Sequence, residues 1–162
     1  MKAVFLDIDG VLNKAPRGDD TYFDAYADKS LALDDGCVWN LKRLFDAHGD
    51  LMVVWSTDWR FYDEPVWRGR WRNPRLYLES LPWLAGRILG KTPRKMSSEH
   101  FHDVKWWLDE NGTGIDGYVV LDDCCFPKDW FGIERHFVRC DPEHGLTESA
   151  AEKAIKILEG AF

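Results

Sequence analysis

The sequence lacks a long apolar run, an excess of basic residues and any repeated or low-complexity segment. No apolar stretch approaches the roughly 20 residues that span a bilayer, which argues against a transmembrane helix. The first residues show no basic region followed by an apolar stretch and a cleavage site, so we expect no secretory signal. With 28 acidic against 21 basic residues, the formal charge of −7 excludes a generally basic coat for nucleic acid but not a local basic patch.

Cysteine is also scarce, with four residues at Cys37, Cys124, Cys125 and Cys140. No two of them form a C-x-x-C pair, which argues against a structural zinc site. The adjacent pair suits a reducing compartment better than a disulfide framework. We therefore expect ordinary thiols and a cytoplasmic location.

What the chain does have is a globular composition: 162 residues, 45% hydrophobic and 30% charged. This length predicts one domain over residues 1–162 with a sizeable core. Short apolar runs predict buried strands, and segments of helical spacing or capping alternate with them, which indicates an α/β fold with a parallel sheet. The expected strands are 3–7, 51–55, 87–90, 118–121 and 136–139, and the expected helices are 35–48, 73–81, 97–110 and 147–159.

Carboxylates follow two of these strands. Asp7 and Asp9 stand at the end of the first strand, and Asp122 and Asp123 at the end of the strand over 118–121. Ligands of parallel α/β sheets bind outside the carboxyl ends of the strands. Carboxylates gathered there repel one another unless a cation lies between them, and a hard oxygen cluster suits Mg²⁺. The sequence therefore predicts a magnesium site at this edge.

Hydroxyl groups follow the second strand, at Ser56 and Thr57. A hydroxyl and the backbone N–H groups beyond it can donate to phosphate oxygens at such a position. Taken alone the signal is weak, because Ser and Thr at strand ends usually form turns.

Three features occur in order along the chain: the segment 7–12, which fits the pattern D-x-D-G-V-[LT], the hydroxyl after the second strand, and the later Asp pair. In these features and in their order the chain resembles the haloacid dehalogenase superfamily. Most of its members are Mg²⁺-dependent phosphohydrolases. Further matching segments cover nearly the full chain and resemble a small branch without a cap domain. This branch includes a domain of RNA-repair proteins, and the chain is also similar to the 3′-phosphatase half of bacteriophage polynucleotide kinase. The resemblance implies a three-layer Rossmannoid fold with a mainly parallel central sheet. Only a flap over 13–34 and an insertion over 59–86 would serve as a cap.

The resemblance also implies roles for the carboxylates. Asp7 would be the nucleophile that becomes an aspartyl phosphate, and Asp9 the general acid and then the base. The metal would be held by Asp7, the backbone carbonyl of Asp9, Asp122 and Asp123. Thr57 would hold the transferring phosphoryl group, with Ser56 as the competing register.

The superfamily's third motif is a cation that offsets the charge of the phosphate and the nucleophile, and three lysines compete for it here. Lys105 is the favoured candidate, because the run 103–105 resembles the viral phosphatase. Lys95 lies near the expected start of the same helix, where other members often place this lysine. Lys91 is the third candidate.

A segment rich in Trp and Arg follows the Thr57 strand, over residues 59–75. Arg interleaved with aromatic residues suits phosphate contact combined with base stacking. We expect Arg60 and Trp59 to contact the substrate. For the rest of the segment the alternative is that Trp67 and Trp71 pack a helix at i,i+4 spacing, with solvated Arg between them.

These features predict an Mg²⁺-dependent phosphohydrolase with an aspartyl-phosphate intermediate, acting on a nucleic-acid end or a nucleotide. Two alternatives stay open. The substrate could be a small phosphorylated metabolite, or the chain could be a non-catalytic module that binds a phosphorylated ligand. The sequence does not define the oligomeric state.

Overall fold

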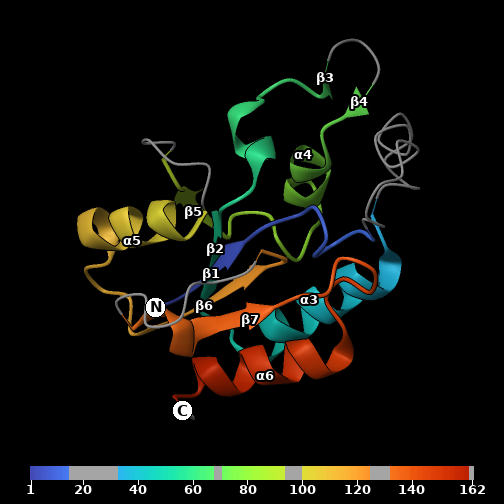
Figure 1. Cartoon of the computed structure of the whole chain (residues 1–162). Helices are drawn as coiled ribbons and strands as arrows, with labels where there is room; N and C mark the ends of the chain where they lie inside the picture. Colours follow the sequence, from blue (N-terminus) through green and yellow to red (C-terminus); the bar gives the residue numbers. More distant parts are fainter. Residues whose placement is uncertain (15–32, 68–70, 94–99, 125–131, 161–162) are drawn as a thin grey trace.

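A computed structural model of the chain describes residues 1–14, 33–67, 71–93, 100–124 and 132–160 (Figure 1). The elements in chain order are β1 (Lys2–Leu6), α3 (Asp35–Ala47), β2 (Leu51–Trp55), η1 (Asp58–Phe61), β3 (Val66–Trp67), β4 (Trp71–Arg72), α4 (Pro74–Glu79), β5 (Ile88–Lys91), α5 (His100–Asn111), β6 (Gly117–Asp122), η2 (Ile133–His136), β7 (Phe137–Arg139) and α6 (Glu148–Leu158). The α/β class and the expected strands and helices are confirmed, with ends that shift by at most two residues where the structure describes them.

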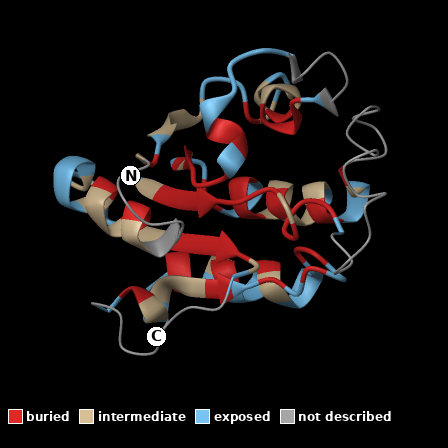
Figure 2. Ribbon diagram, turned by 45° about the horizontal axis from the view of Figure 1, so that its top comes forward, coloured by how far each residue is buried: buried red, intermediate tan, exposed pale blue. Residues whose placement is uncertain are grey.

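The central sheet has five parallel strands in the order β5-β2-β1-β6-β7. The inner strands are almost wholly buried, as their continuous apolar sequences require. Figure 2 shows these buried strands at the centre and the exposed faces of the helices outside them. The carboxyl ends of all five strands therefore open at one edge.

Alternate residues of the strands feed two separate cores. Leu6, Trp55 and Leu121 face the core that α3 and α6 cover. Phe5 and Val120 face a second core, which is covered by Val104 and Trp107 of α5. The three layers predicted from the resemblance are thus α3 and α6, the sheet, and α5 (Figure 1).

Local signals explain where several helices begin. Asp34 caps α3 by accepting from the Cys37 N–H at 3.0 Å, and Thr147 caps α6 by accepting from the Ala150 N–H at 3.2 Å. Asn73 caps α4, and Pro74 follows it at the first helical position, where no N–H is needed. The cap expected near residues 97–98 lies outside the described residues.

The insertion over 59–86 differs from the helical alternative in one part. Trp67 and Trp71 pair with each other across the antiparallel strands β3 and β4. They therefore belong to a two-stranded antiparallel sheet, and their i,i+4 spacing does not reflect a helix. The short helix expected over 73–81 is present as α4.

No helix in the described part of the chain has both the length and the apolar character needed to cross a membrane.

Candidate active site

Asp7 and Asp9, the carboxylates that follow the first strand, occupy a tight turn beyond β1. Asp7 is 4% exposed, and its backbone N–H still belongs to the sheet, donating to the Leu121 carbonyl at 3.0 Å. Its Oδ1 accepts from the Ile8 N–H at 2.7 Å. The chain then turns through Gly10, whose φ of +73° lies in the left-handed region. This turn holds Asp7 at the strand end and carries Asp9 beyond it.

Strand register places three candidate site residues in one row. Leu6 is paired with Trp55 on β2 and with Leu121 on β6. One residue further, Asp7 therefore stands between Ser56 and Asp122. Directly paired residues point to the same face of a sheet, and here that is the face covered by α5. Asp122, Asp7 and Ser56 thus form a row across β6, β1 and β2, and all three are nearly buried.

The end of β6 supplies the candidate metal ligands. One ligand atom each from Asp122, Asp123 and Cys124 lies within 4.8 Å of the others. The Asp122 Oδ1 accepts from the Cys124 N–H at 2.9 Å. Burial, and then the nearby Asp122 and Asp123 carboxylates, raise the pKa of the Cys124 thiol. Carboxylate oxygens are therefore the charged donors that this cluster offers to a cation.

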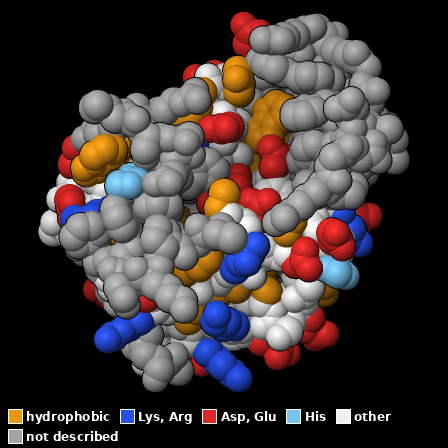
Figure 3. All heavy atoms as spheres, viewed as in Figure 1, with side chains coloured by type: hydrophobic (Ala, Val, Ile, Leu, Met, Phe, Trp, Pro, Cys, Tyr) orange, Lys and Arg blue, Asp and Glu red, His pale blue; other side chains and the backbone are white. Residues whose placement is uncertain are grey.

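This donor set fits magnesium rather than zinc. Mg²⁺ prefers carboxylate and carbonyl oxygens, whereas Zn²⁺ sites in proteins are built mainly on thiolates and imidazoles. Asp7 stands next to Asp122 in the row described above, so it can join Asp122 and Asp123 around one cation. In the space-filling view, acidic side chains gather near the middle of the face (Figure 3).

Gly10, in the turn after β1, lies against the acidic cluster at the end of β6. A Cβ atom placed on Gly10 would lie 2.6 Å from the Asp123 Oδ2. The close approach brings the backbone on either side of Asp9 beside the Asp123 carboxylate, and only glycine allows it.

We expect Gly10→Ala to weaken magnesium binding, because the added methyl group must displace the Asp123 carboxylate. The Mg²⁺ concentration that gives half-maximal binding should rise about tenfold, and stability should fall by about 1–2 kcal/mol from the left-handed backbone. Gly86→Ala is the matched control, since Gly86 has a φ of +76° with no atom within 4 Å of its Cβ position. Titration calorimetry with MgCl₂ and urea unfolding measure the two effects. Equal Mg²⁺ affinity in the two variants would contradict the assignment of Asp123 to the metal.

The two hydroxyl candidates have different surroundings. Ser56 is 1% exposed, and its Oγ has no hydrogen-bond partner in the described part of the chain. Thr57 is fully buried and caps η1, its Oγ1 accepting from the Trp59 N–H at 3.4 Å. Trp55, the last residue of β2, faces the core that α3 and α6 cover. Continued alternation beyond it predicts that Ser56 faces the α5 side with Asp7 and that Thr57 faces the opposite side.

Arg60 lies inside the protein, and direct substrate contact does not fit its burial. Its side chain is 1% exposed, and its Nη2 forms an ion pair with Asp103 at 2.8 Å. The same guanidinium donates to the backbone carbonyls of Thr57 and Thr92. Arg60 therefore ties the end of β2, the loop after β5 and helix α5 together. Asp103 carried no signal of this role in the sequence, because a lone Asp on a helix usually faces water.

Trp59 is buried as well, with 6% of its surface exposed. Its indole Nε1 donates to the Asp9 Oδ2 at 3.1 Å. The expected stacking of a substrate on this ring does not fit that burial, although the residue does lie in the site. Asn13, counted in the sequence as the first residue of a flap, bonds the other Asp9 oxygen at 3.0 Å. Of the flap expected over 13–34, residues 15–32 lie outside the described residues, and Lys14 pairs with Asp34 at 2.9 Å.

The lysine candidates for the third motif fall in three places. Lys105 pairs with Asp109 one turn further along α5, at 2.6 Å, outside the buried face formed by Val104 and Trp107. Lys91 ends β5 and donates to the Arg60 carbonyl at 3.1 Å. Lys95 lies outside the described residues, in the segment that joins β5 to α5. The assignment of this role stays a prediction.

The other arginines of the segment 59–75 do not form one patch. Arg75 is 7% exposed and pairs with Asp63 and Glu79. Arg72 is exposed on β4, and Arg68 and Arg70 lie outside the described residues. At least two of the five arginines, Arg60 and Arg75, therefore stabilise the insertion rather than face a ligand.

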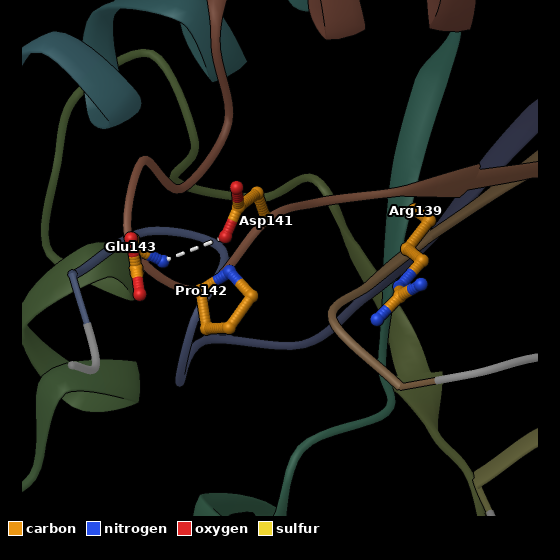
Figure 4. Close-up of a pocket in the computed structure, with 4 residues that line it drawn as sticks. All are labelled: Arg139, Asp141, Pro142 and Glu143. Atoms are coloured by element: carbon orange, nitrogen blue, oxygen red, sulfur yellow. Dashed lines mark hydrogen bonds between the residues drawn. The ribbon is translucent and has the colours of Figure 1, made fainter. Parts of the chain in front are cut away.

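A pocket of about 400 Å³ opens beside the acidic cluster (Figure 4). It is lined by Arg139, Asp141, Pro142 and Glu143. Arg139 on β7 is the backbone register partner of Asp122 on β6. The Arg139 Nε donates to the Asp123 carbonyl at 3.4 Å. The pocket thus adjoins the candidate metal ligands.

The parallel sheet with acidic turns after β1 and β6 defines a haloacid dehalogenase-like protein. A family model described as "HAD domain in Swiss Army Knife RNA repair proteins" matches residues 3–151, and the chain belongs to this family. The superfamily predicted from the segment 7–12 is therefore confirmed. Neither the curated proteins nor the solved structures yield a match.

Proposed function

We propose that the protein is an Mg²⁺-dependent phosphohydrolase whose substrate is a phosphorylated nucleic-acid end or nucleotide. The row of Asp122, Asp7 and Ser56 is the observation that carries the proposal. Its members lie at the carboxyl ends of three neighbouring strands, which suits the roles we propose for them: metal ligand, nucleophile and phosphate-binding hydroxyl. The RNA-repair context in the family description supports the substrate class.

In the proposed reaction Asp7 and Asp9 divide the chemistry. An Asp7 carboxylate oxygen attacks phosphorus, and the bond from phosphorus to the leaving oxygen breaks while Asp9 gives that oxygen a proton. Asp9 then takes a proton from water, which attacks the aspartyl phosphate and releases inorganic phosphate. Ser56 donates to a phosphoryl oxygen.

Magnesium, held by Asp7, the Asp9 carbonyl, Asp122 and Asp123, would offset the repulsion between the phosphate dianion and the Asp7 carboxylate. The family's third cation would add to this, from Lys95, Lys105 or Lys91. The Arg139 pocket offers room for the part of the substrate beyond the phosphate. We also propose a single domain without a separate cap. Free thiols at Cys37, Cys124 and Cys140 fit the cytoplasmic location that we propose.

The test is phosphate release from a defined panel with MgCl₂ or with EDTA. The panel holds 3′-phosphorylated and 5′-phosphorylated oligoribonucleotides, mononucleotides, sugar phosphates and p-nitrophenyl phosphate. We expect Mg²⁺-dependent release, with an oligonucleotide or nucleotide as the best substrate. Turnover of sugar phosphates alone would favour a metabolite phosphatase. Magnesium binding without turnover of any ester would instead favour a binding module.

Substitution of the two hydroxyl residues separates their roles. Ser56→Ala should lower kcat/KM about tenfold, because it removes a donor to the phosphoryl group. Thr57→Val should lower stability by about 1 kcal/mol through loss of the η1 cap, with a smaller effect on kcat/KM. Steady-state kinetics and urea unfolding of both variants provide the measurement. The reverse pattern would assign the phosphate contact to Thr57.

A further inference from the structure

The Asp9 carboxylate is held at both oxygens by side chains from different parts of the chain. Trp59 donates from Nε1 to Oδ2 at 3.1 Å, and Asn13 donates from Nδ2 to Oδ1 at 3.0 Å. We propose that Trp59 and Asn13 are positioning residues that fix the plane of the Asp9 carboxyl group for proton transfer. This inference rests on the proposed function, in which Asp9 is the general acid and base.

The Asn13 side chain has its orientation fixed by the turn. Its Oδ1 accepts from the Gly10 N–H at 2.8 Å, and the side chain is 1% exposed. Since the carboxamide oxygen must face that N–H, the amide nitrogen must face Asp9. Asn13 therefore joins the Gly10 backbone and the Asp9 side chain in one rigid turn.

Trp59 is held just as firmly from the other side. Its carbonyl accepts from the Arg75 Nε at 3.3 Å, and its ring packs edge-on to Tyr62 with the centroids 6.0 Å apart. The ring also belongs to the core that α3 and α6 cover. Because the indole cannot turn without disturbing its packing on Tyr62 and in this core, its N–H is a fixed donor at Asp9.

Neutral donors suit this task. A carboxyl group offers about four lone-pair positions, so two bonds define its plane and leave positions for exchange of a proton. An Arg or Lys in place of Trp59 would bring a positive charge against Asp9, whereas the indole and the carboxamide orient it without one. Orientation of a reacting group in advance lowers the barrier of the step it performs.

The experiment compares leaving groups. Proton donation matters most for an alkyl phosphate, whose alkoxide leaves poorly, and least for p-nitrophenyl phosphate. Trp59→Phe keeps the ring but removes the donor. We expect it to lower kcat for the alkyl ester, or for the best oligonucleotide, about tenfold more than kcat for p-nitrophenyl phosphate. Trp83→Phe is the control, because its ring packs on Phe45 in the same core.

Asn13→Asp tests the second donor. The new carboxylate can still accept from the Gly10 N–H, but it repels Asp9 instead of donating to it. The same selective loss is expected for the alkyl ester. In an Asp9→Asn background, neither substitution should change the ratio between the two substrates further.

The outcomes separate the two proposals. Trp59→Phe and Asn13→Asp variants that lose activity equally on both esters, or keep the wild-type ratio, overturn the positioning role while the phosphohydrolase stands. Wild-type protein without Mg²⁺-dependent turnover of any ester overturns the proposed function, and this inference with it. Selective loss that disappears in the Asp9→Asn background supports both.

Discussion

Asp7→Asn is expected to reduce phosphate release by at least about a thousandfold, because an amide cannot serve as the nucleophile. The substitution keeps the size of the side chain and its oxygen acceptor for the Ile8 N–H, which lies 2.7 Å from Oδ1. The loss should therefore appear in kcat and not in the fold. Without magnesium the variant should be at least as stable as the wild type, since one charge beside Asp122 is removed.

A direct measurement accompanies this prediction. Wild-type protein quenched in acid during turnover of a ³²P-labelled substrate should carry label that hydroxylamine removes, as expected of an acyl phosphate. Asp7→Asn should carry none. Asp46→Asn, at an exposed acid on α3 that pairs with Lys42, is the control and should match the wild type. Undiminished turnover by Asp7→Asn would exclude Asp7 as the nucleophile.

The fold was predictable because its signals are local. Runs such as 3–6 and 51–55 are apolar at every position, which indicates strands buried on both faces. Asp34, Asn73 and Thr147 begin helices by capping backbone N–H groups within three residues. The acidic turns could be located for the same reason, since each follows directly from a buried strand.

The contacts that complete the site depend on residues far apart in the chain. Trp59 and Asp9 are separated by 50 residues, and Arg60 and Asp103 by 43. A segment of Arg and aromatic residues is typical of a ligand-binding surface. Nothing in the neighbouring sequence shows that Arg60 is buried and paired with a distant carboxylate. Likewise, the polar residues from position 13 onward favour a flap. Only the structure shows that Asn13 belongs to the turn after β1, where it bonds Gly10 and Asp9.

The choice between Ser56 and Thr57 shows what register adds. In the sequence both hydroxyls follow the same strand, and a shift of one residue exchanges them. Pairing of Leu6 with Trp55 fixes which one continues the row of Asp7. Because side chains alternate along a strand, that pairing also fixes which hydroxyl faces the α5 side.

The buried ion pair predicts the largest effect on stability. Arg60 and Asp103 are 1% and 2% exposed at their side chains, and their charged atoms lie 2.8 Å apart. Asp103→Ala would leave the Arg60 guanidinium buried. It would keep its bonds to the Thr57 and Thr92 carbonyls and the exposed Asp58 carboxylate, 3.7 Å from Nη1. We expect the free energy of unfolding to fall by about 3–5 kcal/mol, because a buried charge that loses its buried partner is costly.

Urea unfolding measures this loss, and Asp109→Ala provides the control. Asp109 pairs with Lys105 on the same helix but is 57% exposed, so its removal should cost less than about 0.5 kcal/mol. Both variants exchange Asp for Ala in α5, which cancels much of the difference in helix propensity. The double variant Arg60→Met with Asp103→Leu should recover most of the lost stability, since both buried charges are removed together. Equal losses in the Asp103 and Asp109 variants would show that the buried pair does not hold β2, the loop after β5 and α5 together.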